Sequence, residues 1–135
     1  MRFMMIVKAT KDSEAGLPPN PALMAAVAKM AEEATKSGAL LGAGGLMPSS
    51  QGARIRVAGG KTSVIDGPFA ETKELVGGYA IFDLPSKEEA IRSGTRFMQV
   101  HADILGPSYE GELEIRPLFD GQPSGIQCEE AKYAG

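Results

Sequence analysis

Asp66 and His101 are the two side chains of this 135-residue chain whose types and settings suit proton transfer. Asp66 precedes a Gly-Pro turn at the end of an apolar segment, so its carboxylate would lie at the rim of a sheet and could act as a general base. His101 is the single histidine, and its ordinary pKa near neutrality suits the matching acid, with Asp103 placed to orient its ring. This pair predicts a cofactor-independent elimination or isomerisation of a small polar or aromatic metabolite.

Both residues also have a structural interpretation. Asp66 could accept backbone N–H bonds within its own turn, while Pro68 and Phe69 fix and anchor the bend. His101 could satisfy free carbonyls at a helix end or interact favourably with the helix dipole. The sequence leaves both alternatives open.

Charged side chains that could position a substrate occur in two places. Glu71, Lys73 and Glu74 lie in a segment that is too polar for a core. We expect Glu71 and Glu74 to contact substrate, whereas Lys73 is more typical of a surface ion pair. Arg116, in the last predicted strand, could hold a carboxylate or phenolate by paired hydrogen bonds, although such a residue is more often solvated.

No metal or cofactor site is expected from the residue types. The single histidine and the single cysteine, Cys128, do not make a ligand cluster, and the carboxylates have no recognisable ligand spacing. The glycine-rich segments match neither phosphate-binding pattern in a strand-to-helix setting, so nucleotide binding is not predicted.

Charge and hydropathy restrict the partners. Fourteen Lys and Arg against 17 Asp and Glu give a net charge of −3, which argues against a nucleic-acid partner. No segment approaches the roughly 18 consecutive apolar residues of a membrane span, and the N-terminal apolar run is too short for a signal peptide. We therefore expect a cytoplasmic protein without a membrane partner.

The N-terminal half predicts a strand, a helix and a second strand. Residues 2–8 are apolar on both faces, as expected of a strand inside a sheet. Asn20 can cap a helix over 21–37, with a proline at the first position and a glycine after the last turn. The glycine-rich strand over 39–46 indicates a bulge or a close backbone approach.

The second half begins with a hairpin. Residues 54–57 and 62–65 flank a Gly-Gly turn, and Arg54 and Arg56 lie on the polar side of the first strand. Another strand apolar on both faces is predicted over 79–84. The remaining predicted elements are a helix over 86–100, begun by a Ser-x-x-Glu capping box, and a last strand over 112–116.

This order of elements predicts an α+β fold, a ferredoxin-like split βαβ sandwich with an inserted β-hairpin. The domain would cover residues 1–119 and leave a C-terminal tail over 120–135. Two helices can cover only one face of the sheet, yet strands 2–8 and 79–84 are apolar on both faces. A homodimer that covers the second face is the simplest remedy.

The segment from Val64 to Glu74, which contains the Asp-Gly-Pro-Phe run, together with Gly77-Gly78-Tyr79, resembles the DGPF-type members of the YCII-related proteins. The resemblance covers most of residues 1–119. It extends to three further segments: Arg2–Met5, Gly45–Pro48, and the ending from Tyr109 to Pro117.

The resemblance implies a bacterial protein that forms a dimeric α/β-barrel assembly of ferredoxin-like subunits with a small-molecule site. In the wider group a His-Asp pair is suspected of catalysis, and one relative resembles a dehydrochlorinase that acts on a hydroxylated aromatic compound. Because many relatives lack a known reaction, a non-catalytic small-molecule-binding or regulatory module is the alternative.

Overall fold

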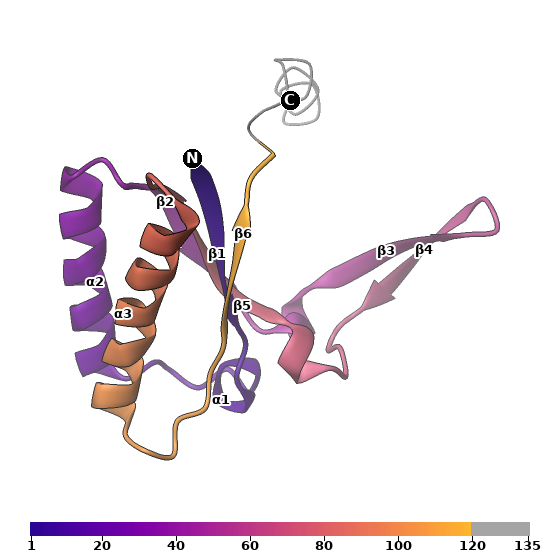
Figure 1. Cartoon of the computed structure of the whole chain (residues 1–135). Coiled ribbons are helices and arrows are strands. Elements are labelled where there is room, and N and C mark those ends of the chain that lie inside the picture. The colour runs from indigo at the N-terminus through magenta and orange to yellow at the C-terminus, as the bar shows by residue number, and fades with distance from the viewer. Residues whose placement is uncertain (120–135) are drawn as a thin grey trace.

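The computed structural model describes residues 1–119 as a four-stranded antiparallel sheet, two long helices on one of its faces, and a separate hairpin (Figure 1). The helices and strands are β1 (Arg2–Lys8), α1 (Lys11–Glu14), α2 (Pro21–Lys36), β2 (Leu40–Gly45), β3 (Ala53–Ala58), β4 (Lys61–Asp66), β5 (Val76–Asp83), α3 (Lys87–Leu105) and β6 (Leu113–Pro117). Short 3-10 helices occur at Ser49–Gln51 and Thr72–Glu74. The predicted tail, which includes Cys128, lies outside the described residues.

The predicted α+β class and the inserted hairpin are confirmed. The sheet has the strand order β2-β5-β1-β6, and every neighbouring pair is antiparallel. β3 and β4 pair only with each other. Within residues 1–119, no helix combines the length and the apolar content needed to cross a membrane.

Helix α2 begins at the predicted residue and ends one residue before the predicted 37. Asn20 Oδ1 accepts hydrogen bonds from the backbone N–H groups of Ala22 and Leu23, at 2.8 and 3.2 Å, and Pro21 is the first helical residue. Gly38 has a φ of +82°, the left-handed conformation that favours glycine after a helix. These local signals are strong enough to set both helix ends.

Helix α3 extends five residues beyond the predicted 86–100. Ser86 Oγ accepts a hydrogen bond from the backbone N–H of Glu89 at 3.2 Å, which confirms the start. The helix continues to Leu105 and stops at Gly106, whose φ is +87°. His101 therefore lies within the last turns of α3, where its ring is held by packing rather than at a free helix end.

The start of β5 and the presence of helix α1 also differ from the prediction. β5 begins at Val76 rather than at residue 79, because Gly77 and Gly78 let the strand approach its neighbours closely. A Cβ at either glycine would lie 3.2 Å from a backbone atom of the adjoining segments. Helix α1 was not predicted; Thr10 caps it through a hydrogen bond of 3.1 Å from the backbone N–H of Ser13.

The core lies between the helices and the sheet. Phe3 and Met5 of β1 are buried against Ala90 of α3. Four half-buried apolar residues pack around them: Phe82, Leu84, Leu113 and Ile115. At Gly94 a Cβ would lie 2.7 Å from Leu113 Cδ2, so this glycine lets α3 lie close to β6.

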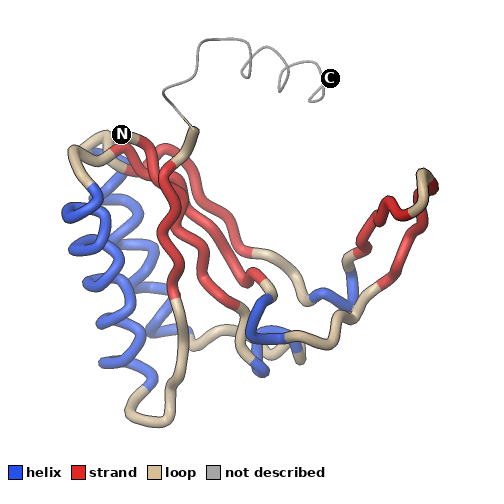
Figure 2. Tube along the Cα trace, turned by 45° about the vertical axis from the view of Figure 1, so that its right-hand side comes forward, coloured by secondary structure: helices blue, strands red, loops and turns tan. Residues whose placement is uncertain are grey.

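Neither α2 nor α3 covers the other face of the sheet (Figures 1 and 2). Strand alternation puts Met4 and Ile6 of β1 on this face, opposite Ile81 and Tyr79 of β5. Gly44 of β2 lies beneath the ring of Tyr79, to which a Cβ would come within 3.1 Å. We call this surface, Met4, Ile6, Tyr79 and Ile81, the open face.

The β3–β4 hairpin, residues 53–66, forms an arm that projects from one end of the sheet on the side away from the helices (Figures 1 and 2). Its turn has Gly59 and Gly60 at φ values of +57° and +76°, as the Gly-Gly pair predicts. All of its residues are exposed.

Candidate functional site

A cleft of about 480 Å³ lies where the arm joins the body of the protein. Its polar side chains include Glu14, Ser49, Arg54 and Glu74. Its apolar wall includes Leu46, Met47, Phe69 and Leu75. Because Phe69 and Glu74 belong to the segment that carries the Asp-Gly-Pro-Phe run, we call this site the motif cleft.

Glu14 and Ser49 form the hydrogen-bonded floor of the motif cleft. The backbone N–H of Ser49 donates to Glu14 Oε2 at 2.8 Å, and Ser49 Oγ donates to Glu14 Oε1. These hydrogen bonds hold the pKa of the Glu14 carboxyl below its usual value. Glu14 is therefore a charged acceptor whose oxygens are already engaged, and it is poorly suited to take a proton at neutral pH.

The Gly-Pro-Phe segment rests on the loop that contains Ser49. The backbone N–H of Phe69 donates to Ser49 Oγ at 3.1 Å, and the backbone N–H of Gly67 donates to the Gly52 carbonyl at 3.0 Å. A Cβ on Gly67 would lie 1.7 Å from the carbonyl oxygen of Ser49, so no other residue fits this approach. The glycine of the motif thus has a steric role in building the cleft.

Arg54 supplies the cation of the motif cleft. Its guanidinium carbon lies 3.8 Å from the centroid of the Phe69 ring, a cation–π geometry. Among residues 1–119, Arg54 forms no ion pair with a carboxylate. Its planar fork of N–H donors therefore remains available to an anion in the cleft.

The structure brings one of the five predicted site residues into the motif cleft, Glu74. Asp66 is the last residue of β4; it is exposed, pairs with Ala53 and does not line the cleft. Glu71 is also exposed, and its side chain makes no capping hydrogen bond to the short helix that follows it.

His101 lies on the sheet-facing side of α3, with 8% of its surface exposed. Its ring centroid is 4.6 Å from that of Phe97 and 5.8 Å from that of Tyr109. Nδ1 lies 2.9 Å from the Phe97 carbonyl oxygen, and because a carbonyl only accepts, Nδ1 carries the proton. Burial also raises the pKa of the Tyr109 hydroxyl.

The second nitrogen of His101, Nε2, bonds to no described residue. His101 as a whole keeps 8% of its surface exposed. Asp103 does not orient the ring as predicted, because it accepts a hydrogen bond from Gln99 at 2.8 Å. Residues two apart on a helix do not face each other, which explains this wrong prediction.

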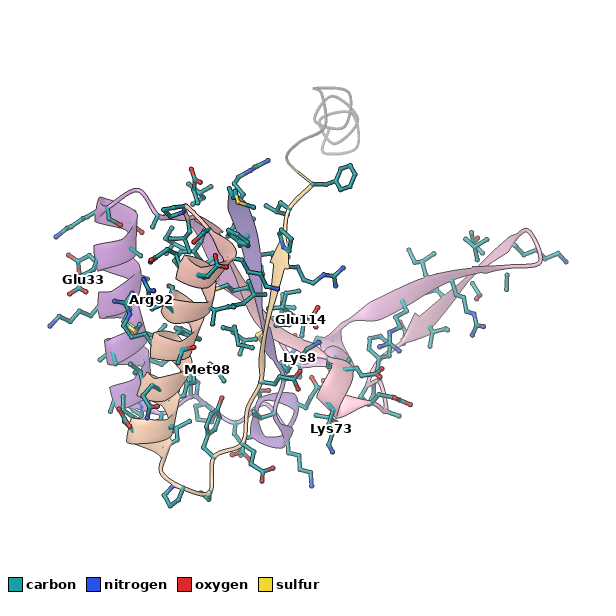
Figure 3. The ribbon with its side chains drawn as sticks, viewed as in Figure 1. Lys8, Glu33, Lys73, Arg92, Met98 and Glu114 are labelled. Carbon is teal, nitrogen blue, oxygen red and sulfur yellow. The ribbon has the colours of Figure 1, made fainter. Side chains whose placement is uncertain are left out.

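Arg116 lies on the uncovered side of β6, where it pairs with Glu114 at 3.0 Å. Lys8 of β1 also pairs with Glu114, at 3.1 Å, and the two side chains lie side by side in Figure 3. Arg116 and Lys8 together hold the pKa of the Glu114 carboxyl below its usual value. Arg116 is thus placed on the sheet, apart from the residues that line the motif cleft.

A second cavity, of about 590 Å³, lies between α3 and β6 and is lined by residues that include Gly94, Met98 and Leu113. None of the five predicted site residues lines it. Among residues 1–119 there is also no group of three or more His, Cys, Asp or Glu side chains arranged to hold a metal ion.

The residues of the motif cleft that sequence reasoning missed include Glu14 and Ser49. Ser49 directly follows Gly45–Pro48, one of the segments that carry the family resemblance, and this position was a usable signal. Glu14 had no comparable signal, because its role depends on a contact with a residue 35 positions away.

The sequence pattern of the YCII-related domain matches residues 1–104, which include every residue that lines the motif cleft. The chain belongs to the YCII-related domain family. It is also similar to an uncharacterised protein of Rhizobium meliloti (strain 1021), with 36% identity over 81 residues. That alignment spans 60% of this YCII-related chain and 60% of the relative.

Proposed function

We propose that this YCII-related protein binds a small amphipathic molecule in the motif cleft. The observation that carries the proposal is the Arg54 guanidinium, which lies over Phe69 without a carboxylate partner among residues 1–119. The cleft volume, about 480 Å³, falls within the range of small-molecule sites.

The side chains of the cleft define the chemistry of the ligand. A carboxylate or phenolate would accept paired hydrogen bonds from Arg54, and an aromatic or aliphatic body would contact Leu46 and Met47. Glu74 forms no ion pair with a described residue and would accept a hydrogen bond from a hydroxyl or amino group. A hydroxylated aromatic carboxylate has all three features.

Titration calorimetry with a panel of hydroxylated aromatic carboxylates tests this proposal. A charge-assisted hydrogen bond contributes about 1.5–3 kcal/mol, so Arg54→Gln should raise Kd about 10- to 150-fold. Arg56→Gln is the matched control, because Arg56 lies on the same face of the arm but does not line the cleft. If Arg54→Gln and Arg56→Gln bind the compounds with equal affinity, or if no compound of the panel binds saturably to the unmodified protein, the proposal is refuted.

Cofactor-independent proton transfer, such as elimination or isomerisation, is a second candidate. It is favoured by the Glu74 carboxylate, which lines the cleft with no ion-pair partner in the described chain. Asp66 and His101 remain the base and acid proposed from the sequence for this candidate, and neither lines the motif cleft of the single chain.

Proton release with the same panel separates catalysis from binding. Catalysis requires turnover that falls at least 100-fold in Glu74→Gln, Asp66→Asn or His101→Gln, a loss larger than the change in stability of the same variant explains. Saturable binding without turnover would leave the binding module as the function. Turnover that survives all three substitutions would remove these groups from the reaction.

We also propose that the chain is a ferredoxin-like subunit of a homodimer of the dimeric α/β-barrel type. The topology supports the subunit fold, because β1-α2-β2 and β5-α3-β6 are two βαβ units whose strands interleave in the order β2-β5-β1-β6. The open face supports the dimer, because its apolar side chains would otherwise face water.

A further inference from the structure

The arm is not explained by the proposed ligand site or by a dimer that uses the sheet alone. Ile55, Val57 and Val64 lie on one of its faces and are 67 to 75% exposed. A single two-stranded hairpin is at best marginally stable in water. Three exposed β-branched side chains on such an element indicate a surface that is covered by another molecule.

We propose that the arm clasps a second copy of this chain that is seated on the open face, an inference that rests on the homodimer proposed above. The arm projects on the side of the sheet that faces away from α2 and α3 (Figures 1 and 2). The open face looks to the same side, so a body packed on it lies within reach of the arm. In a two-fold dimer each arm then contacts the other subunit.

The size of the open face supports this arrangement. Four strands about 4.8 Å apart and about 17 Å long present roughly 330 Å² in projection, whereas each partner in a standard interface buries about 800 Å². One face of the arm adds roughly 190 Å² in projection. Because side chains protrude from the sheet, the accessible area of each surface is larger than its projected area. The open face and the arm together therefore approach the area of a standard interface, whereas the open face alone does not.

The basic side chains of the arm lie away from the proposed contact. Arg54, Arg56 and Lys61 share one face of the arm, whereas Ile55, Val57 and Val64 share the other. The apolar face of the arm can therefore meet the second copy without burying a basic side chain.

The proposed dimer also completes the motif cleft. Leu46 and Met47, on the cleft wall, are 51 and 68% exposed in the single chain. Both lie between β2 and the start of the arm, next to the space that the second copy occupies. Dimer formation would cover them and raise the affinity of the cleft for an apolar ligand body.

Sedimentation at micromolar concentration, with two aspartate variants of the arm, tests the proposal. Ile55→Asp places a carboxylate on the apolar face of the arm and should raise the dimer Kd at least 100-fold, because each dimer carries the change twice. Ser63→Asp is the control; it adds the same charge to the opposite face, across from Arg56, and should change the dimer Kd less than threefold. Equal Kd values for Ile55→Asp, Ser63→Asp and the unmodified chain would overturn the arm contact.

A third variant separates this proposal from the sheet dimer on which it rests. Ile81→Asp puts a carboxylate on the open face, opposite Met4, and should produce monomers. If Ile81→Asp is monomeric while Ile55→Asp remains a tight dimer, the open face forms the interface and the arm does not. A monomeric unmodified chain would overturn both proposals.

Photo-crosslinking keeps the test valid if Ile55→Asp unfolds the arm. A benzoylphenylalanine at Val57 is placed in a mixture of isotope-labelled and unlabelled full-length chains. Mixed-label crosslinks are expected if the arm contacts a second copy. Crosslinks found only within one chain would overturn the proposal.

Discussion

Gly67→Ala should destabilise the base of the arm by an amount that follows from two distances. The new Cβ would lie 1.7 Å from the carbonyl oxygen of Ser49 and 2.6 Å from its carbonyl carbon. Backbone atoms cannot rotate away as a flexible side chain can, so the two segments must separate by roughly 1.5–2 Å to reach ordinary contact. That separation breaks the hydrogen bonds from Gly67 to Gly52 and from Phe69 to Ser49.

Two lost hydrogen bonds at about 1 kcal/mol each lower the free energy of unfolding by about 2 kcal/mol. Unfolding entropy for the 119 described residues is about 0.25 kcal/mol/K, so the melting temperature should fall by about 8 °C. Circular dichroism on heating measures this change. Gly52→Ala is the matched control, because its Cβ would meet the same carbonyl oxygen at 3.5 Å, an ordinary contact, with φ at −104°.

Hydrogen exchange distinguishes a local opening from a global loss of stability. If only the base of the arm opens, the amides of Gly67 and Phe69 lose protection while those of β1 and β5 retain it. If Gly67→Ala has the same melting temperature and the same amide protection as Gly52→Ala, the steric role of Gly67 is refuted.

The remaining predictions concern Ser49 and His101. Ser49→Ala should raise the pKa of the Glu14 carboxyl toward its usual value, whereas the control Ser50→Ala should not. Carboxyl chemical shifts followed by NMR against pH measure this pKa. A Glu14 pKa that is equal in both variants would contradict the prediction. Because folding lowers the pKa of Glu14, its charged form stabilises the fold above the unfolded-state pKa, and this stabilisation disappears as pH falls through the folded-state pKa. In Ser49→Ala the melting temperature should therefore fall less steeply with decreasing pH. His101→Gln loses two ring contacts, which should lower the free energy of unfolding by about 1–2 kcal/mol and leave ligand affinity in the motif cleft the same. Unchanged stability together with a loss of ligand affinity would contradict the packing role of His101.

Features that depend on short-range chemistry were predicted from the sequence. Asn20 and Pro21 start α2, and Gly59-Gly60 turns the hairpin, because caps and tight turns use the side chains and backbone of adjacent residues. The open face was also predicted, since alternation along a strand shows which side chains share a face.

The candidate site was predicted less well, because it depends on contacts between distant segments. The Asp-Gly-Pro-Phe run lies beside the motif cleft, yet the run's Phe69, rather than its Asp66, lines the cleft. Glu14 and Ser49 meet only when the segment before α2 folds against the loop after β2. No spacing or composition within either segment reports that contact.

The hydrogen bonds at the base of the arm also order the events of folding. The paired residues of β3 and β4 are at most 13 positions apart in the sequence, the largest separation being that of Ala53 and Asp66. A hairpin of this kind forms in about 1–10 μs. The Phe69 and Glu14 bonds to Ser49 span 20 and 35 positions, so they close longer loops at a larger cost in chain entropy. Loop closure alone therefore favours assembly from the tip of the arm toward its base, and contacts that form after the folding transition state would change the unfolding rate more than the folding rate.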